Sequence, residues 1–306
     1  MAPVTSQLQL HLLNVGQGEA ILIDLPDGSF MLLDGGPKAE DPVVLGAIEK
    51  RVEAGRPFRL AGISQWDADH IRGIPAILRA FPPEEFRVPG VDLQLLEEIA
   101  RREVDEDIAT LSASVRDAIE ALPPSRRQSF TACGRIEDLG GIDAHVLSPS
   151  PCVADEIRHR IGRSHRAAHE VLKEFRNRAS VALWLRYGGR TLLLSGEADG
   201  DQYRTMRQYF LRDFGGLLPH RGDYAADWIK LSHHGANENN PDDLFKFFGR
   251  AGFVASASAG GDYNHPHPSA LKRLHFDYGG VAMCTGLGKG CDHCGCFSGF
   301  GNIFRS

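Results

Sequence analysis

Three short apolar segments of the chain each end in a cluster of side chains that commonly bind metal ions. The segments span 60–64, 192–194 and 228–231, and the clusters that follow them are Asp67-Ala68-Asp69-His70, Glu197-Ala198-Asp199 and His233-His234. Loops at strand ends are where binding sites are commonly built. Any one cluster has a plain structural explanation, such as a helix-capping aspartate or a core histidine. Together the three clusters predict a divalent-metal site at one shared sheet edge.

The order of apolar runs predicts a layered α/β fold. Short apolar or alternating runs at 8–13, 20–24 and 30–33 are separated by glycine-rich turns, which is typical of consecutive strands. Further strands alternate with helices after residue 180. At 306 residues, with 42% hydrophobic residues, the chain can bury a substantial core. We expect a single domain over 1–306, with sheets covered by helices.

The segment 91–178 has a different pattern from its flanks. It is charged, and its apolar residues from Leu93 to Ile119 lie mostly three or four positions apart, which indicates helices. One strand is expected at 142–147. We therefore expect 91–178 to be a largely helical insertion.

The chain resembles the metallo-β-lactamase superfamily, and within it the hydrolase domain of ComEC-type competence proteins. Six motifs between residue 8 and about residue 275 carry the resemblance through their order and spacing: Leu12–Ile23, Leu33–Gly36, Asp67–Ile71, Ser195–Ala198, Lys230–Gly235 and His265–Pro268. The resemblance implies a four-layer αββα sandwich with a metal centre at one edge of its two sheets. It also implies hydrolysis as the reaction.

The superfamily motif HxHxDH supplies ligands to two metal ions. In this chain Gln65 stands at the first histidine and Asp67 at the second, whereas the Asp-His pair is kept as Asp69-His70. Glu197 falls at the position of the bridging aspartate. The ligand set that the resemblance implies is Asp67, Asp69, His70, Glu197 and His234.

The resemblance also implies roles for residues beside the metal. We assign His234 as the ligand and His233 as the group that faces the substrate, and the reverse assignment stays open. Asp34 would orient a ligand, and Gln65, Asn177 and Ser180 would act as weak ligands or support. A rigid Pro-stiffened loop with surface histidines is the alternative for the 265–268 motif. The catalytic residues implied are Asp69, His233, His265 and His267.

The number of oxygen donors bears on the identity of the metal. A site with Asp67, Glu197 and the amides of Gln65 and Asn177 is rich in oxygen, which suits Mn²⁺ or Mg²⁺. Zn²⁺ can bind through His70 and His234. We expect one or two divalent ions, which would lower the pKa of bound water and polarise a phosphoryl or carbonyl oxygen.

A second metal site is suggested by four cysteines near the C-terminus. Cys284, Cys291, Cys294 and Cys296 are enough thiolates for a four-coordinate structural Zn²⁺. Their spacing differs from that of common zinc ribbons, so reduced free thiols are the alternative.

The net charge of −6 argues against a surface that binds nucleic acid along its whole length. A local basic segment lies at 158–178, where either a solvated helical face or a contact with a phosphate backbone is expected. The residues predicted to make such contacts are Arg163, Arg166, Arg176 and Arg178. No signal peptide and no membrane-spanning run is found, so we expect a cytoplasmic protein without membrane contact.

Three functions are compatible with these observations. The first is a metal-dependent phosphodiesterase or nuclease that acts on DNA or RNA. The second is a hydrolase of a small ester, lactone or phosphorylated metabolite, since one fold hosts many chemistries. The third is a non-catalytic binding or assembly protein with a degenerate metal site. Protein partners in a larger system are compatible with each.

Overall fold

The computed structural model of the chain describes residues 7–89, 105–130, 134–163, 177–209, 226–248, 252–257, 265–278 and 281–285. Its strands form two sheets. The first sheet has the order β1-β2-β3-β4-β5-β6, and its strands are β1 Gln9–Leu12, β2 Ile21–Asp24, β3 Phe30–Leu33, β4 Phe58–Gly62, β5 Glu85–Pro89 and β6 Arg127–Phe130. Antiparallel pairing of β1, β2 and β3 changes to parallel pairing from β3 onward.

The second sheet has the order β13-β12-β11-β10-β9-β8-β7. Its strands are β7 Arg135–Ile136, β8 Asp143–Ser148, β9 Ala182–Tyr187, β10 Arg190–Leu194, β11 Trp228–Lys230, β12 Gly252–Ala255 and β13 Val281–Cys284. Strands β10 to β13 are parallel, so their carboxyl ends meet at one edge. Loops that follow parallel strands can therefore converge there.

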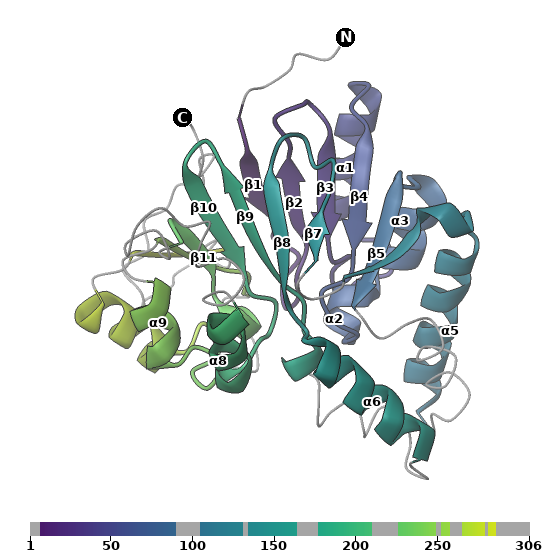
Figure 1. Cartoon of the computed structure of the whole chain (residues 1–306). Helices are drawn as coiled ribbons and strands as arrows, with labels where there is room; N and C mark the ends of the chain where they lie inside the picture. Colours follow the sequence, from purple (N-terminus) through teal and green to yellow (C-terminus); the bar gives the residue numbers. More distant parts are fainter. Residues whose placement is uncertain are drawn as a thin grey trace.

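Helices cover the outer face of each sheet (Figure 1). The helices α1 Pro42–Glu53, α3 Ile74–Ala80 and α5 Glu106–Glu120 pack on the first sheet, and α8 Gly200–Tyr209, α9 Asp242–Phe248 and α10 Pro268–Lys272 pack on the second. Two further helices lie near the sheet edge, α2 Ala68–Ile71 and α6 Pro151–Arg163. Short 3₁₀ segments span Pro124–Arg126, Asn177–Ala179 and Ser232–Gly235, and a π-helical turn spans Arg273–Asp277.

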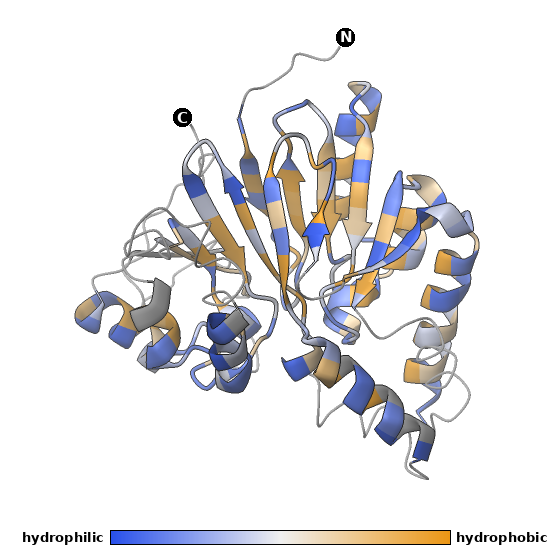
Figure 2. Cartoon of the chain, in the orientation of Figure 1, coloured by the Kyte–Doolittle hydropathy of each residue, from blue (hydrophilic) through white to orange (hydrophobic). Residues whose placement is uncertain are grey.

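Alternating side chains explain the four layers. Along β10, Leu192 and Leu194 enter the apolar layer between the sheets, whereas Leu193 faces the outer helices. On β2, Ile21 and Ile23 face the same inner layer and Leu22 faces α1 and α3. A strand that is buried on both faces reads as a continuous apolar run, as these two do. Figure 2 shows these apolar strands and the apolar sides of the covering helices. The αββα sandwich expected from the sequence is therefore present.

The described part of 91–178 contains the strand expected at 142–147, which is β8, and two strands that were not expected, β6 and β7. In its described part, α5 and α6 are helices, but β6 extends the first sheet beside β5, and β8 pairs with β9 in the second sheet. These residues complete both sheets rather than standing apart from them. The strand β6 is polar, Arg-Gln-Ser-Phe, and its only fully buried side chain is Phe130, so its sequence carries little strand signal.

None of the helices in the described residues is both long and apolar enough to cross a membrane.

Candidate metal centre

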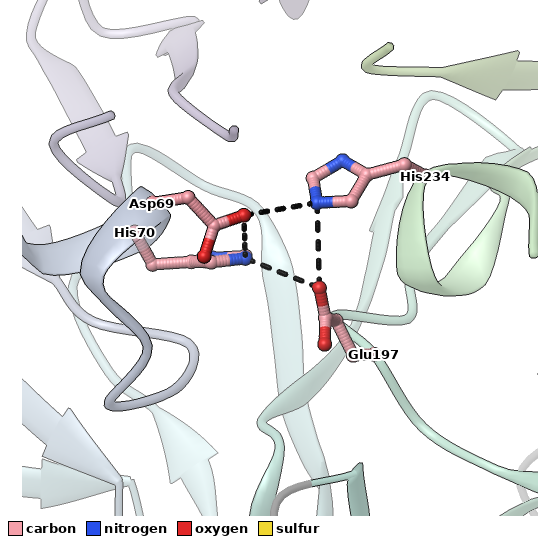
Figure 3. A group of neighbouring side chains, drawn as sticks. All are labelled: Asp69, His70, Glu197 and His234. Carbon is pink, nitrogen blue, oxygen red and sulfur yellow. Dashed lines mark hydrogen bonds and ion pairs between the residues drawn. The ribbon is translucent and has the colours of Figure 1, made fainter. Parts of the chain in front are cut away.

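Three loops meet at the edge of the sandwich and bring four ligand-type side chains together (Figure 3). Asp69 and His70 lie on α2, which follows β4, Glu197 follows β10, and His234 lies in the 232–235 turn after β11. One donor atom from each of the four lies within 4.8 Å of each of the others. Side chains separated by more than 160 positions in the sequence thus share one small volume.

The spacing of these donors matches one cation. The distances are 3.3 Å from His234 Nε2 to Asp69 Oδ2, 3.3 Å from His234 Nε2 to Glu197 Oε1, 3.4 Å from His70 Nε2 to Glu197 Oε1 and 3.8 Å from His70 Nε2 to Asp69 Oδ2. Metal–ligand bonds of about 2.1 Å place neighbouring donors about 3.4 Å apart in a tetrahedron and about 3.0 Å apart in an octahedron. The two imidazoles and two carboxylates therefore fit a divalent ion.

Hydrogen bonds fix which nitrogen of each imidazole faces the centre. His70 Nδ1 lies 2.9 Å from Asp34 Oδ2, and both residues are fully buried. Asp34, in turn, accepts hydrogen bonds from the backbone N and hydroxyl of Ser64 at 2.7 and 2.6 Å. His234 Nδ1 donates to the carbonyl of Ser256 at 2.7 Å. Because each Nδ1 carries the proton that it donates, each Nε2 presents a lone pair to the centre once its own proton is lost.

Two hydrogen bonds of its backbone hold Glu197 in position. Its N–H donates to Ser180 Oγ at 2.8 Å, and its carbonyl accepts from Asn239 Nδ2 at 3.1 Å. The preceding Gly196 has a φ of +54°, and a Cβ there would lie 2.4 Å from Ser180 Oγ, so only glycine fits this turn. Ser180, predicted as a supporting residue, thus contacts the backbone of Glu197 rather than its carboxylate.

The titration of the four groups follows from their mutual burial. Burial alone would raise the pKa of Glu197, but hydrogen bonds with His234 and His70 and the charges of the histidines hold it well below its usual range. Burial would also raise the pKa of Asp69, but the positive charge of His70 and a hydrogen bond with His234 lower it below its usual value. Without metal, both carboxylates are therefore ionised at neutral pH.

The pKa values of the two histidines, His70 and His234, are raised. Burial would lower the pKa of His70, yet the negative charges of Asp34 and Asp69 raise it well above its usual value. Burial would likewise lower the pKa of His234, but its hydrogen bonds with Asp69 and Glu197 raise this pKa to about 9. In the metal-free protein at pH 7, the imidazolium ions of His70 and His234 therefore face the carboxylates of Asp69 and Glu197, and the negative charge of Asp34 also faces His70.

Asp67 lies outside the cluster, and Gln65 and Asn177 have buried amide atoms. Asp67 is the N-cap of α2, is half-buried and is not among the four clustered donors. Gln65 is 2% exposed, and neither end of its amide has a hydrogen-bond partner in the described part of the chain. The buried Oδ1 of Asn177 is likewise without a hydrogen bond to the described residues. The helical turn of α2 separates the two aspartates, because it turns Asp69 and His70 inward and leaves Asp67 at its start.

His233 and His265 lie beside the cluster. His233 Nε2 is 3.7 Å from Glu197 Oε2, its Nδ1 donates to Asn239 Oδ1 at 3.1 Å, and its side chain is 32% exposed. Its ring lies 5.6 Å from that of His265. Burial, followed by the positive charges of His233 and His234, lowers the pKa of His265 to about 4. A neutral imidazole and a partly exposed one thus lie beside the cluster.

The backbone at 233–234 is bent to achieve this arrangement. Both His233 and His234 have left-handed conformations, with φ of 49° and 52°. Such a conformation is costly for a residue other than glycine and is often found at functional sites. The turn directs His234 into the four-donor cluster and leaves His233 beside it.

His267 was predicted to be catalytic, but its ring lies at the N-terminus of α10. Its Nδ1 accepts a hydrogen bond from the backbone N of Ser269 at 3.2 Å, and it is the N-cap of α10. Its backbone N–H donates to the carbonyl of Gly235 at 3.0 Å. The ring is therefore engaged in capping a helix.

The remaining predicted sites fall mostly outside the described residues. Cys291, Cys294, Cys296, Arg166 and Arg176 lie there, and for Cys284 only the backbone is described. Arg163 is exposed at the end of α6, and Arg178 pairs with Glu156 at 3.4 Å.

Sequence reasoning missed Ser256 and Asn239. Ser256 follows β12 and contacts His234 through its backbone carbonyl, which every residue type possesses, so no sequence signal marks it. Asn239 joins His233 to the carbonyl of Glu197, and nothing in its neighbourhood distinguishes it from an ordinary loop asparagine.

Comparisons with known proteins agree with this architecture. The crystal structure of the metallo-β-lactamase fold protein YhfI from Bacillus subtilis is similar over 92% of this chain and 98% of that chain, with a TM-score of 0.51 and 10% identity. No protein-family profile matches the sequence. The chain has the metallo-β-lactamase fold.

Two curated proteins of ComEC type are similar in sequence. ComE operon protein 3 of Bacillus subtilis is 21% identical over 292 residues, which cover 89% of this chain and 31% of that protein. Recombination protein 2 of Haemophilus influenzae is 23% identical over 273 residues, which cover 87% of this chain and 26% of that protein. The chain spans about a third or less of the length of these relatives.

Proposed function

We propose that this protein is a metal-dependent hydrolase that cleaves phosphodiester bonds in DNA or RNA. The four-donor cluster at the edge of a metallo-β-lactamase fold is the observation that carries the proposal. Similarity to ComEC-type proteins, one of which is named a recombination protein, favours a nucleic-acid substrate over a small ester or lactone.

The proposed cofactor is one Zn²⁺ ion held by Asp69, His70, Glu197 and His234. Four of the six donor separations are 3.3 to 3.8 Å, close to the separation of about 3.4 Å expected for a tetrahedral Zn²⁺ ion, and all six lie within 4.8 Å. Asp67, which the sequence argument for Mn²⁺ counted as an oxygen donor, is not a member of the cluster. When bound, the ion would supply Lewis acidity to a phosphoryl oxygen and lower the pKa of a water molecule.

Two histidines supply the remaining chemistry. With its pKa lowered to about 4, His265 is neutral at pH 7 and can accept a proton or a hydrogen bond. His233 is partly exposed beside Glu197, and Asn239 fixes its ring, so it can contact a phosphate oxygen or donate a proton to the leaving group.

The substrate backbone needs cationic contacts near the centre. Arg178 shares Glu156 with Arg160, in ion pairs of 3.4 and 3.3 Å, whereas Arg72 and Arg79 form no ion pair in the described part of the chain. Both line a groove of about 240 Å³ between α3 and α5, and Arg72 follows His70 by two residues. Guanidinium groups without partners suit a phosphate backbone, and their loss should reduce the salt dependence of binding. We therefore add Arg72 and Arg79 to the exposed Arg163 as candidate contacts.

The direct test is cleavage by purified protein loaded with Zn²⁺, Mn²⁺ or Mg²⁺. Single- and double-stranded DNA, RNA and bis(p-nitrophenyl) phosphate would be assayed beside an ester and a lactone. We expect phosphodiester cleavage that Asp69→Ala abolishes and that the surface variant Arg204→Ala leaves unchanged. Cleavage of the ester or lactone alone would refute the substrate assignment, and no cleavage of any compound would favour a binding protein.

A further inference from the structure

Glu19 and Lys230 form an ion pair in the interior of the sandwich. Glu19 is 1% exposed and Lys230 is 0% exposed, and the layer between the sheets is otherwise largely apolar. Removing two charges from water costs several kcal/mol, and a buried ion pair is often no more stabilising than apolar side chains of the same size. Stability alone is therefore a poor explanation for this pair.

Glu19 lies on a turn that contacts the backbone of the ligand Asp69 and the residue Ser256, which supports the ligand His234. Its backbone N–H donates to the carbonyl of Asp69 at 3.2 Å. The neighbouring Gly18 accepts a hydrogen bond from Ser256 Oγ at 2.8 Å, and the carbonyl of Ser256 holds His234 Nδ1. Gly18 lies so close to Asp69 that a Cβ would be 2.6 Å from the carbonyl oxygen of Asp69. This turn therefore contacts the loop of one ligand and the support of another.

Lys230 contacts the third ligand loop. Its Nζ donates to the carbonyl of Gly196 at 2.8 Å, immediately before Glu197. The carbonyl of Lys230 accepts from Ser195 Oγ at 2.5 Å, on the same loop. As the last residue of β11, Lys230 also precedes the 232–235 turn. The ammonium group thus joins the segment before Glu197 to the start of the histidine turn.

We propose that the Glu19–Lys230 ion pair is a positioning element that sets the separation between metal ligands of the two sheets. Asp69 and His70 come from the first sheet, and Glu197 and His234 come from the second, so the ion must bridge the sandwich. The ion pair bridges the same two sheets and contacts the backbone on both sides. Hydrogen bonds from Lys230 Nζ to the carbonyl of Gly196 and from the backbone N–H of Glu19 to the carbonyl of Asp69 tie each side of the ion pair to a ligand loop, so the pair fixes a separation that apolar packing would leave adjustable.

The inference rests on the proposed metal centre but not on the proposed substrate, so its test measures metal binding without catalysis. The variants are Glu19→Gln, Lys230→Met and the double variant, which removes both charges and keeps the side-chain volumes. Co²⁺ is the probe, because its absorption spectrum reports the geometry of its ligands. Thermal unfolding of each metal-free protein is followed by circular dichroism.

Asp24→Asn is the matched control. Asp24 is a buried carboxylate at the opposite end of β2, where it pairs with Arg51 at 2.6 Å and Arg56 at 2.9 Å. Its variant breaks a buried ion-pair network without contact to the ligand loops. We expect it to lower Tm and to leave the Co²⁺ spectrum and affinity unchanged.

For the double variant we expect a folded protein whose Co²⁺ affinity falls by about 10- to 100-fold, as on loss of residues that orient ligands, with an altered spectrum. Native affinity and spectrum in the folded double variant would overturn the proposal. Unfolding of every Glu19 and Lys230 variant, with Asp24→Asn folded, would also overturn it in favour of a general role in the fold. No Co²⁺ binding by the unaltered protein would refute the metal centre itself.

Discussion

Loading the metal-free protein with a divalent ion should release about two protons at pH 7. Asp69 and Glu197 are already ionised there, and His70 and His234 are protonated, because the pKa of each is shifted in the folded protein. A coordinated histidine must be neutral, so each imidazolium loses its proton to solvent. The charge of the cluster is then the same before and after the exchange of two protons for one divalent ion.

Because two protons are lost, the apparent affinity for the metal ion should depend steeply on pH. Between the pKa of the carboxylates and that of His234, about 9, this affinity should rise by roughly 100-fold per pH unit. Raising the pKa of His234 from 6.5 to about 9 also stabilises the metal-free fold by about 3 kcal/mol. Because the pKa of His234 is raised on folding, its contribution to the free energy of unfolding is fully present below pH 6.5. The contribution is lost as the pH rises through 9. The metal-free protein should therefore lose stability from pH 6.5 to 9.

Calorimetric titration with Zn²⁺ in buffers of different ionisation enthalpy counts the protons directly. The slope of the observed enthalpy against the buffer enthalpy should correspond to about two protons per ion. Asp67→Asn serves as the control, since Asp67 is not a member of the cluster. A slope of fewer than about one proton would mean that both imidazoles are neutral before metal binds, which would contradict the raised pKa values of His70 and His234.

Three further predictions follow from single contacts. Asp34→Asn removes the carboxylate that orients His70 and should lower metal affinity by about 10- to 100-fold in competition with a chromophoric chelator; native affinity would contradict its orienting role. Gly18→Ala forces a Cβ to 2.6 Å from the Asp69 carbonyl and should lower both Tm and metal affinity. Gly46→Ala, in helix α1 with open space around it, should instead raise stability by about 0.5–1 kcal/mol, and equal effects of the two glycine variants would count against the close approach. Removal of the ion with a chelator should lower the free energy of unfolding by about 2.7 kcal/mol relative to protein at 100 times Kd, and an unchanged Tm would contradict a site confined to the folded state.

The sequence was sufficient to predict the layers and the convergence of three loops. Doubly buried strands such as Leu192–Leu194 are continuous apolar runs, and a polar cluster at the end of each strand marks the edge where sites form. The same local pattern was insufficient for β6, because a polar strand with one buried side chain has little periodicity.

The finer assignment of ligands depended on geometry that the sequence does not contain. Asp67 and Asp69 are equally good ligands by residue type, and only the start of helix α2 between them separates one from the other. The supports of His234 and Glu197 come from Ser256 and Asn239, which are polar residues on distant loops. Long-range backbone contacts of this kind require the folded chain.

A crystal structure of the zinc-loaded protein with anomalous scattering would locate the ion and its ligands. The proposed metal centre requires one ion within about 2.2 Å of His70 Nε2, Asp69 Oδ2, Glu197 Oε1 and His234 Nε2. An ion bound elsewhere, or a cluster that stays ion-paired without metal at saturating Zn²⁺, would contradict it.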